Sequence, residues 1–130
     1  MFSSEACTRN IRVKVSSTYA PEHSDPSDHR WFFYYTVEIT NEGTEAARLI
    51  SRHWIITDAS QQVEEVRGLG VVGKQPVLGP GQTFSYSSGC PLTTSFGTMR
   101  GSYQMVATEG GEHFDVEIAP FTLSEPYTVH

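Results

Sequence analysis

"TMRGSYQMVATEGGEHFDVEI" is the stretch, residues 98–118, that decides the fold class. Its pattern is typical of two strands joined by a tight turn. Apolar and polar residues alternate on both sides of Gly110-Gly111, and a Gly-Gly pair suits a two-residue hairpin turn. The pattern predicts strands at Thr98–Thr108 and Glu112–Ile118, with the apolar pairs Ala107–Phe114, Met105–Val116 and Tyr103–Ile118. All three pairs share one face of the hairpin, so this face is expected to cover a core.

The same two-residue period recurs along the rest of the chain, and no window shows convincing helical periodicity. Turn residues separate the alternating segments, and Pro80 followed by Gly81 fits a type II turn. The other segments expected as strands are Arg9–Tyr19, Trp31–Thr40, Arg48–Asp58, Gln61–Val66 and Gln82–Ser88. About seven such strands predict an all-β fold, namely an immunoglobulin-like or fibronectin type III-like antiparallel β-sandwich.

Length and composition favour one globular domain over the whole chain, 1–130. Its core is expected at 11–123, with a polar loop at 20–30 and a C-terminal tail at 124–130. The formal net charge of −6 disfavours nucleic-acid and anionic-membrane surfaces. No apolar run is long enough for a membrane span and the N-terminus shows no signal peptide, so a cytoplasmic location is expected, with Cys7 and Cys90 as free thiols.

RGLGVVGK, residues 67–74, has the Gly-x-Gly-x-x-Gly spacing of a dinucleotide-binding fingerprint. That fingerprint requires a following helix and an acidic residue about 20 positions further on. The segment KQPVLGPGQ after Gly73 excludes such a helix, and no acidic residue stands near the required position. Two interpretations remain: a loop whose glycines supply positive φ, or an anion-binding nest flanked by two cations. The residues concerned are Arg67, Gly68, Gly70, Gly73 and Lys74.

Arg52-His53-Trp54 is an unusual run for a strand that is predicted to lie in the middle of a sheet. Arg52 and Trp54 should share one face of the strand, and His53 should lie on the other. Arg48, Arg52 and Arg67 could form a polar pocket near the glycine loop; alternatively, Arg52 pairs with an acidic residue and Trp54 belongs to the core. His53 could act as a general base by residue type, but no known pattern places a nucleophile beside it, so no catalytic residue is predicted.

Two polar groups contain residues that bind metals in other proteins. His23, Asp25, Asp28 and His29 lie in one loop, and His113-x-Asp115 lies on the polar face of the C-terminal hairpin. Nitrogen and carboxylate ligands suit zinc and other divalent ions, but neither spacing matches a metal motif. A solvated loop and a solvated strand face are the expected outcome, with no metal and no cofactor.

Four longer stretches resemble the ApaG family of small bacterial proteins. They are SRHWIITD (51–58), EVRGLGVVGKQPVLGPGQTFSYSSG (65–89), GTMRGSYQM (97–105) and HFDVEIAPF (113–121). The resemblance runs from about Ile11 to Leu123 and extends to the similar domain of some eukaryotic F-box proteins and of a DNA-polymerase-interacting protein. It implies a fibronectin type III-like β-sandwich and an association with cobalt and magnesium efflux. It implies no settled enzymatic activity, and there is no catalytic set to carry over.

The leading functional hypothesis is therefore a non-catalytic binding module that recognises a protein partner or a small anionic ligand. Val66–Lys74, with Arg52 and His53, is the expected contact surface. One alternative is a role in divalent-cation homeostasis, and a second is an enzyme that acts on phosphates or nucleotides through the glycine loop. An exposed edge strand could also pair two copies of the chain as a homodimer across a two-fold axis.

Overall fold

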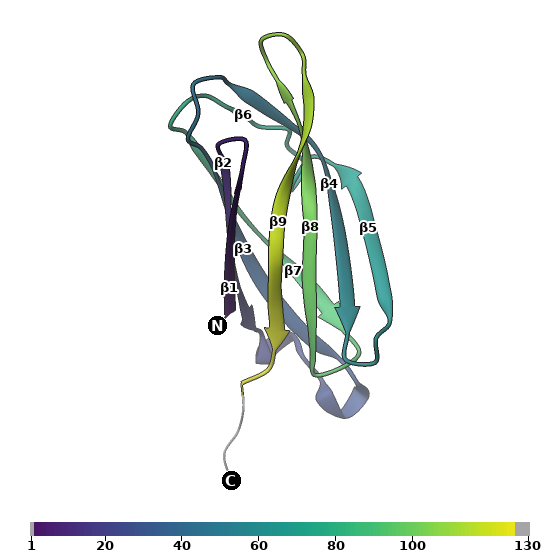
Figure 1. Ribbon diagram of the computed structural model, residues 1–130. Coiled ribbons are helices and arrows are strands. Elements are labelled where there is room, and N and C mark those ends of the chain that lie inside the picture. Colours follow the sequence, from purple (N-terminus) through teal and green to yellow (C-terminus); the bar gives the residue numbers. More distant parts are fainter. Residues whose placement is uncertain (1, 127–130) are drawn as a thin grey trace.

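Two antiparallel β-sheets pack face to face in the computed structural model, which describes residues 2–126 (Figure 1). The first sheet has the order β1 (Phe2–Thr8), β2 (Ile11–Tyr19), β3 (Trp31–Asn41) and β7 (Thr83–Leu92). The second has the order β5 (Val63–Leu69), β4 (Ala47–Asp58), β8 (Phe96–Ala107) and β9 (His113–Ser124), and β6 (Val77–Leu78) also pairs with β4. The predicted all-β sandwich is confirmed, and Arg48–Asp58 corresponds to β4, which is central as expected.

The seven predicted strands are present, and the structure adds β1 and β6. β1 was missed because its sequence, FSSEACT, carries no apolar alternation; instead, Arg9 and Asn10 turn the chain back onto β2 with positive φ values of 50° and 67°. Two short 3₁₀ turns, η1 (Pro21–His23) and η2 (Pro26–Asp28), lie in the loop between β2 and β3. Residues 127–130 of the predicted tail lie outside the described residues.

The register predicted for the C-terminal hairpin is wrong by two residues. Met105 faces Phe114 and Tyr103 faces Val116, and the loop spans four residues, 108–111, rather than two. The turn opens because Thr108 N–H donates to Ala46 O, at 3.0 Å, instead of across the hairpin. A shift of two residues equals the side-chain period of a strand, so the predicted apolar face still faces the core.

The core lies between the inner faces of the two sheets. On β3 the alternation holds, because Phe33, Tyr35, Val37 and Ile39 are all buried. On β4 the pairing with β8 shifts between Leu49 and Ser51, which marks a bulge with one extra residue on β4. Beyond this bulge Trp54 lies inside at 2% exposure, and its pairing partner on β8 is Gly101.

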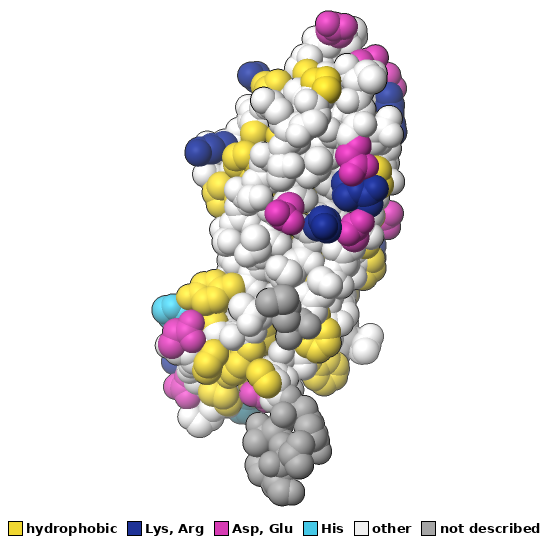
Figure 2. Space-filling model, turned by 90° about the vertical axis from the view of Figure 1, so that its left-hand side faces the viewer, with side chains coloured by type: hydrophobic (Ala, Val, Ile, Leu, Met, Phe, Trp, Pro, Cys, Tyr) yellow, Lys and Arg dark blue, Asp and Glu magenta, His cyan; other side chains and the backbone are white. Residues whose placement is uncertain are grey.

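The two open sides of the sandwich differ. On one side side-chain bonds join β9 to β1 and to β2: Ser4 Oγ of β1 donates to Ala119 O at 2.8 Å, and Ser17 Oγ of β2 donates to Thr122 O at 2.7 Å. On the other side β5 ends the second sheet, and no strand within residues 2–126 pairs with its outer edge (Figure 1). Figure 2 shows the side that carries β1 and β2, where acidic and basic side chains lie next to one another. Arg12 of β2 pairs with Glu5 of β1 and with Glu42.

Both cysteines are free, as predicted: Cys7 is exposed and Cys90 is buried. Burial raises the pKa of the Cys90 thiol to about 12, and burial also raises the pKa values of Tyr86 and Tyr103. The folded state therefore keeps protons that the unfolded state loses, starting near pH 9 for the thiol.

We expect the free energy of unfolding to fall as the pH rises above about 9, by up to about 1.4 kcal/mol per pH unit for each such group. Chemical denaturation at a series of alkaline pH values measures this slope. Cys90→Ala removes one of the groups and should give a shallower slope than the native chain. Parallel pH profiles for the two proteins would show that the thiol does not contribute.

Candidate functional site

The predicted contact residues lie where β5 meets β4, and they divide between the two faces of the second sheet. The register pairs Arg52 with Gly68 and His53 with Arg67. Arg52 is on the inner side with Trp54, whereas His53 and Arg67 are on the outer side, as the alternation predicted. One surface hollow is lined by Arg52 and Arg67 but not by Arg48, so the three arginines do not form one pocket.

Arg52 has a structural role in holding the end of β5. Its Nη1 donates to two backbone carbonyl oxygens, Leu69 O at 3.1 Å and Gly70 O at 2.8 Å. The guanidinium lies flat against Gly68, where a Cβ would come within 2.8 Å of its Cζ. Among the described residues Arg52 makes no ion pair, so the expected pairing with an acidic residue is wrong, whereas Trp54 is a core residue as that interpretation expected.

The glycine loop is a tight turn rather than the start of a helix. Gly70 and Gly73 have φ values of 63° and 79°, which confirms the interpretation that these glycines supply positive φ. The Gly70 N–H donates to Ile50 O, and Val71 and Lys74 exchange backbone bonds of 2.8 and 2.9 Å. These N–H groups are thus already paired within the chain, which leaves few donors for an anion.

His53 and its neighbours form a charged group on the outer face. His53 Nε2 lies 2.7 Å from Glu65 Oε1, and Arg67 Nη2 lies 3.5 Å from the same oxygen. Glu65 thus lies between an imidazole and a guanidinium, and the side chains of Glu65 and Arg67 are more than half exposed. This arrangement balances charge at the surface and gives His53 an acidic neighbour. Ser102 lies opposite His53 on β8, and its hydroxyl accepts a hydrogen bond from Gln104.

A shallow hollow of about 500 Å³ lies on this outer face, between β5 and the neighbouring strands. Hydrogen bonds order its floor, because Ser51 Oγ donates to Gln104 Oε1 at 2.8 Å and Gln104 Nε2 donates to Ser102 Oγ at 2.9 Å. Sequence reasoning did not single out these residues, although all three occupy polar positions of alternating strands. The lining consists of Ser51, Arg52, His53, Arg67, Gly68, Leu69, Ser102, Gln104 and Asp115.

Three apolar side chains of this part of the chain are exposed, and one of them, Leu69, lines the hollow. Leu69 is 75% exposed, Val72 is 54% exposed and Val77 is 45% exposed. Leu69 and Val77 pair with residues of the same edge of β4, and the turn that carries Val72 connects them. We call these three residues the apolar rim.

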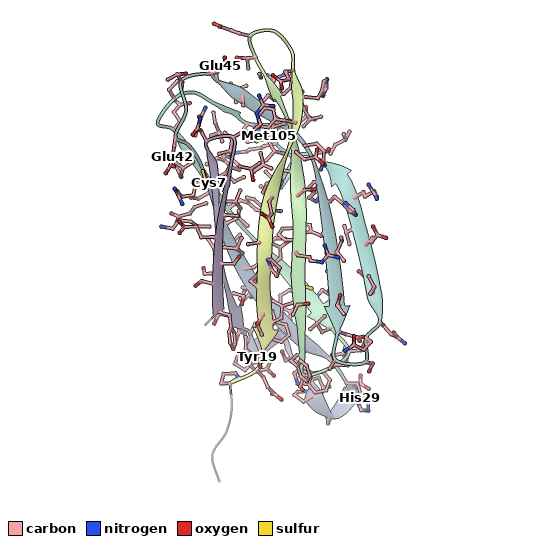
Figure 3. All side chains as sticks on the ribbon, viewed as in Figure 1. Cys7, Tyr19, His29, Glu42, Glu45 and Met105 are labelled. Atoms are coloured by element: carbon pink, nitrogen blue, oxygen red, sulfur yellow. The ribbon has the colours of Figure 1, made fainter. Side chains whose placement is uncertain are left out.

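The histidine and acidic residues of the loop at 20–30 that were considered as metal ligands have other partners. In the loop at 20–30, His23 packs against aromatic rings and Asp25 and Asp28 pair with Arg30, at 3.8 and 2.9 Å. Figure 3 shows His29 at one end of the sandwich and Glu45 at the other. Within residues 2–126 no three His, Cys, Asp or Glu side chains are grouped as they would be around a metal ion.

The fold and this surface define a small β-sandwich module with a polar hollow and an apolar rim at the free end of one sheet. The sequence identifies the family of this module. Residues 21–107 match the family described as the ApaG domain, and the chain belongs to that family. No helix in the part described, 2–126, is long and apolar enough to cross a membrane.

Relatives cover nearly the whole chain. The chain is 57% identical to Protein ApaG of Bordetella pertussis over 121 residues, which are 93% of this chain and 92% of that protein. It is 59% identical to Protein ApaG of Thiobacillus denitrificans over 120 residues, 92% of this chain and 94% of that one. A crystal structure of the B. pertussis protein named ApaA is 58% identical and aligns with a TM-score of 0.87 over 91% of this chain and 95% of its own. None of these names indicates a catalytic family.

Proposed function

We propose that this chain is a non-catalytic binding module that recognises a protein partner through the hollow on the second sheet and the apolar rim beside it. The apolar rim carries the proposal. Leu69 lines the hollow beside polar groups that are fixed in place, and Val72 and Val77 follow it in the chain with exposed apolar side chains. Apolar side chains at the centre with polar groups around them are the usual anatomy of a protein contact surface.

The backbone donors of the glycine loop are already hydrogen-bonded within the chain, which favours a protein over a small anion as the ligand. Arg52, the cation nearest the loop backbone, donates to carbonyl oxygens, and the loop donors Gly70, Val71 and Lys74 are bonded within the chain. Arg67 lies beside Glu65, whose carboxylate opposes an anionic ligand. A protein partner can use the exposed apolar groups as well as the polar ones.

A photo-reactive amino acid placed at Val72 tests the proposal in the native cytoplasm. We expect it to cross-link one defined partner, whereas the same group at Ser85, exposed on β7, should not. With the purified partner, Val72→Glu should weaken binding at least tenfold, or about 1.4 kcal/mol, and Ser85→Glu should leave the affinity unchanged. Equal cross-linking at both positions, or full affinity of Val72→Glu, would exclude the apolar rim as the contact surface.

The small-anion alternative has its own measurement. Ligands that bind only the native state raise its apparent stability, so pyrophosphate is titrated while the melting temperature is followed. If the ligand is a protein, pyrophosphate should not change the melting temperature. A shift that disappears in both Arg67→Ala and Lys74→Ala would replace the protein partner by an anionic ligand held at the glycine loop.

A further inference from the structure

The outer edge of β5 is a row of unpaired backbone groups. The N–H of Gly70 bonds to Ile50 O and the N–H of Asp58 bonds to Gln62 O, one at each end of the β4–β5 pair. Because bonding alternates along an antiparallel pair, the even-numbered residues of β5 face β4. The N–H and C=O groups of Val63, Glu65, Arg67 and Leu69 therefore point away from the sheet, and of these the Leu69 carbonyl also accepts a bond from Arg52 Nη1.

In one register the side chains along this edge are complementary to those of the same edge in a second copy of the chain. When two β5 strands pair antiparallel, residues whose backbone groups point away from the sheet must lie opposite one another. The two-fold axis must then pass through a residue, and the residues near the middle of the strand are Glu65, Val66 and Arg67. A centre at Glu65 places two carboxylates opposite each other, and a centre at Arg67 places two guanidinium groups opposite each other. Only the centre at Val66 avoids a like-charge pair, which costs free energy when directly opposite.

In that register every outer-face pair is favourable. Glu65 faces Arg67 of the second copy, and Arg67 faces its Glu65. Val63, at 61% exposure, faces Leu69 of the second copy, at 75% exposure. Two ion pairs thus lie at the centre, with an apolar pair on each side of them, and cross-strand pairs of both kinds stabilise antiparallel sheets.

The inner face of the strand adds a further match. Arg52 lies over Gly68 without an acidic partner among residues 2–126, and Glu64 occupies the inner face of the same strand. The register centred at Val66 places Glu64 of the second copy opposite Gly68. Its carboxylate then lies on the same face as the Arg52 guanidinium that covers Gly68.

From these matches we infer that two copies of the chain associate through antiparallel pairing of β5 with β5, with Val66 on the two-fold axis. The second sheets of the two copies then form one continuous sheet. Arg67 and Leu69 belong both to this contact and to the surface of the proposed function. The two tests stay distinguishable, because self-association is measured on the chain alone, whereas the test of the proposed function changes Val72 and measures binding of a partner.

Charge-reversal variants test the register by analytical ultracentrifugation. Glu65→Arg alone and Arg67→Glu alone should each weaken self-association at least tenfold, because each brings like charges together. A mixture of the two variants should recover association, since each supplies the charge that the other lacks. Ser85→Arg, on the edge strand β7 of the other sheet, is the matched control and should associate as the native chain does.

Disulfide trapping tests the two-fold centre separately. In a Cys7→Ser background, Val66→Cys should form a covalent dimer on oxidation, because a non-hydrogen-bonded pair has Cα atoms about 4.5 Å apart, within disulfide range. Glu64→Cys should not, because it faces Gly68 of the second copy. A native chain that stays monomeric at about 1 mM, no recovery in the mixture, or cross-linking by Glu64→Cys but not by Val66→Cys would each overturn the inference.

Discussion

Trp54→Ala is expected to lower the free energy of unfolding by about 3–5 kcal/mol, the range for removing a large buried aromatic side chain. Trp54 is 2% exposed and meets Tyr35, Phe121 and Tyr103 edge to face, at ring-centroid distances of 5.4, 5.9 and 6.4 Å. These rings come from both sheets, so the truncation leaves a cavity at the contact between the sheets. Urea unfolding followed by circular dichroism measures the loss, with the denaturant slope checked for a change in cooperativity.

Trp54→Phe is the matched control for this prediction. The indole Nε1 is buried and has no hydrogen-bond partner among the described residues, so phenylalanine keeps a ring in the core and removes an unpaired donor. We expect a loss below about 2 kcal/mol, clearly smaller than for alanine. If both variants lose the same stability, the indole donor has a partner and the ring contacts are not the main contribution.

Gly101→Ala is expected to cost about 3 kcal/mol, at the upper end of the range for overpacking. A Cβ on residue 101 would lie closer than 3.0 Å to the backbone carbonyl oxygen of His53 on the neighbouring strand. No flexible side chain can move aside there, so β4 and β8 must separate at the centre of the second sheet. The midpoint of thermal unfolding should fall by several degrees.

The neighbouring residue provides the comparison for Gly101. Ser102→Ala changes the outer face of the same strand and removes one acceptor used by Gln104, so it should cost less than about 1 kcal/mol. A Gly101→Ala protein as stable as Ser102→Ala would mean that the two strands are further apart than the structure describes.

The strand set was predictable because side-chain alternation is a local signal. β3 shows this best, since its WFFYYTVEIT stretch predicted both the strand and the buried face. The hairpin register was not predictable from the same signal, because a shift of two residues preserves the face pattern and a bond from Thr108 to Ala46, far apart in sequence, decides the turn. β1 depends on pairing with β2 and carries no apolar pattern that could have revealed it.

The candidate site was only partly predictable, for a related reason. The glycine loop and the opposite orientations of Arg52 and His53 follow from residue type and alternation. The contact between the Arg52 guanidinium and Gly68 could not be predicted in this way, because it joins two strands whose register the sequence leaves open. The exposure of Leu69 also could not be read from the chain, because an alternating strand at the end of a sheet has the same pattern as one inside it.

The bonds between β1 and β9 have a consequence for the order of events during synthesis. Among the strands of this fold β1 is synthesised before the others, and β9, which contacts it across the sandwich, is synthesised after them. Until residues near Ala119 emerge, Ser4 and the core-facing side of β2 have no covering strand. The sandwich therefore closes only once β9 has been synthesised, and a chain that stops before β9 exposes this side to proteases and to other nascent chains.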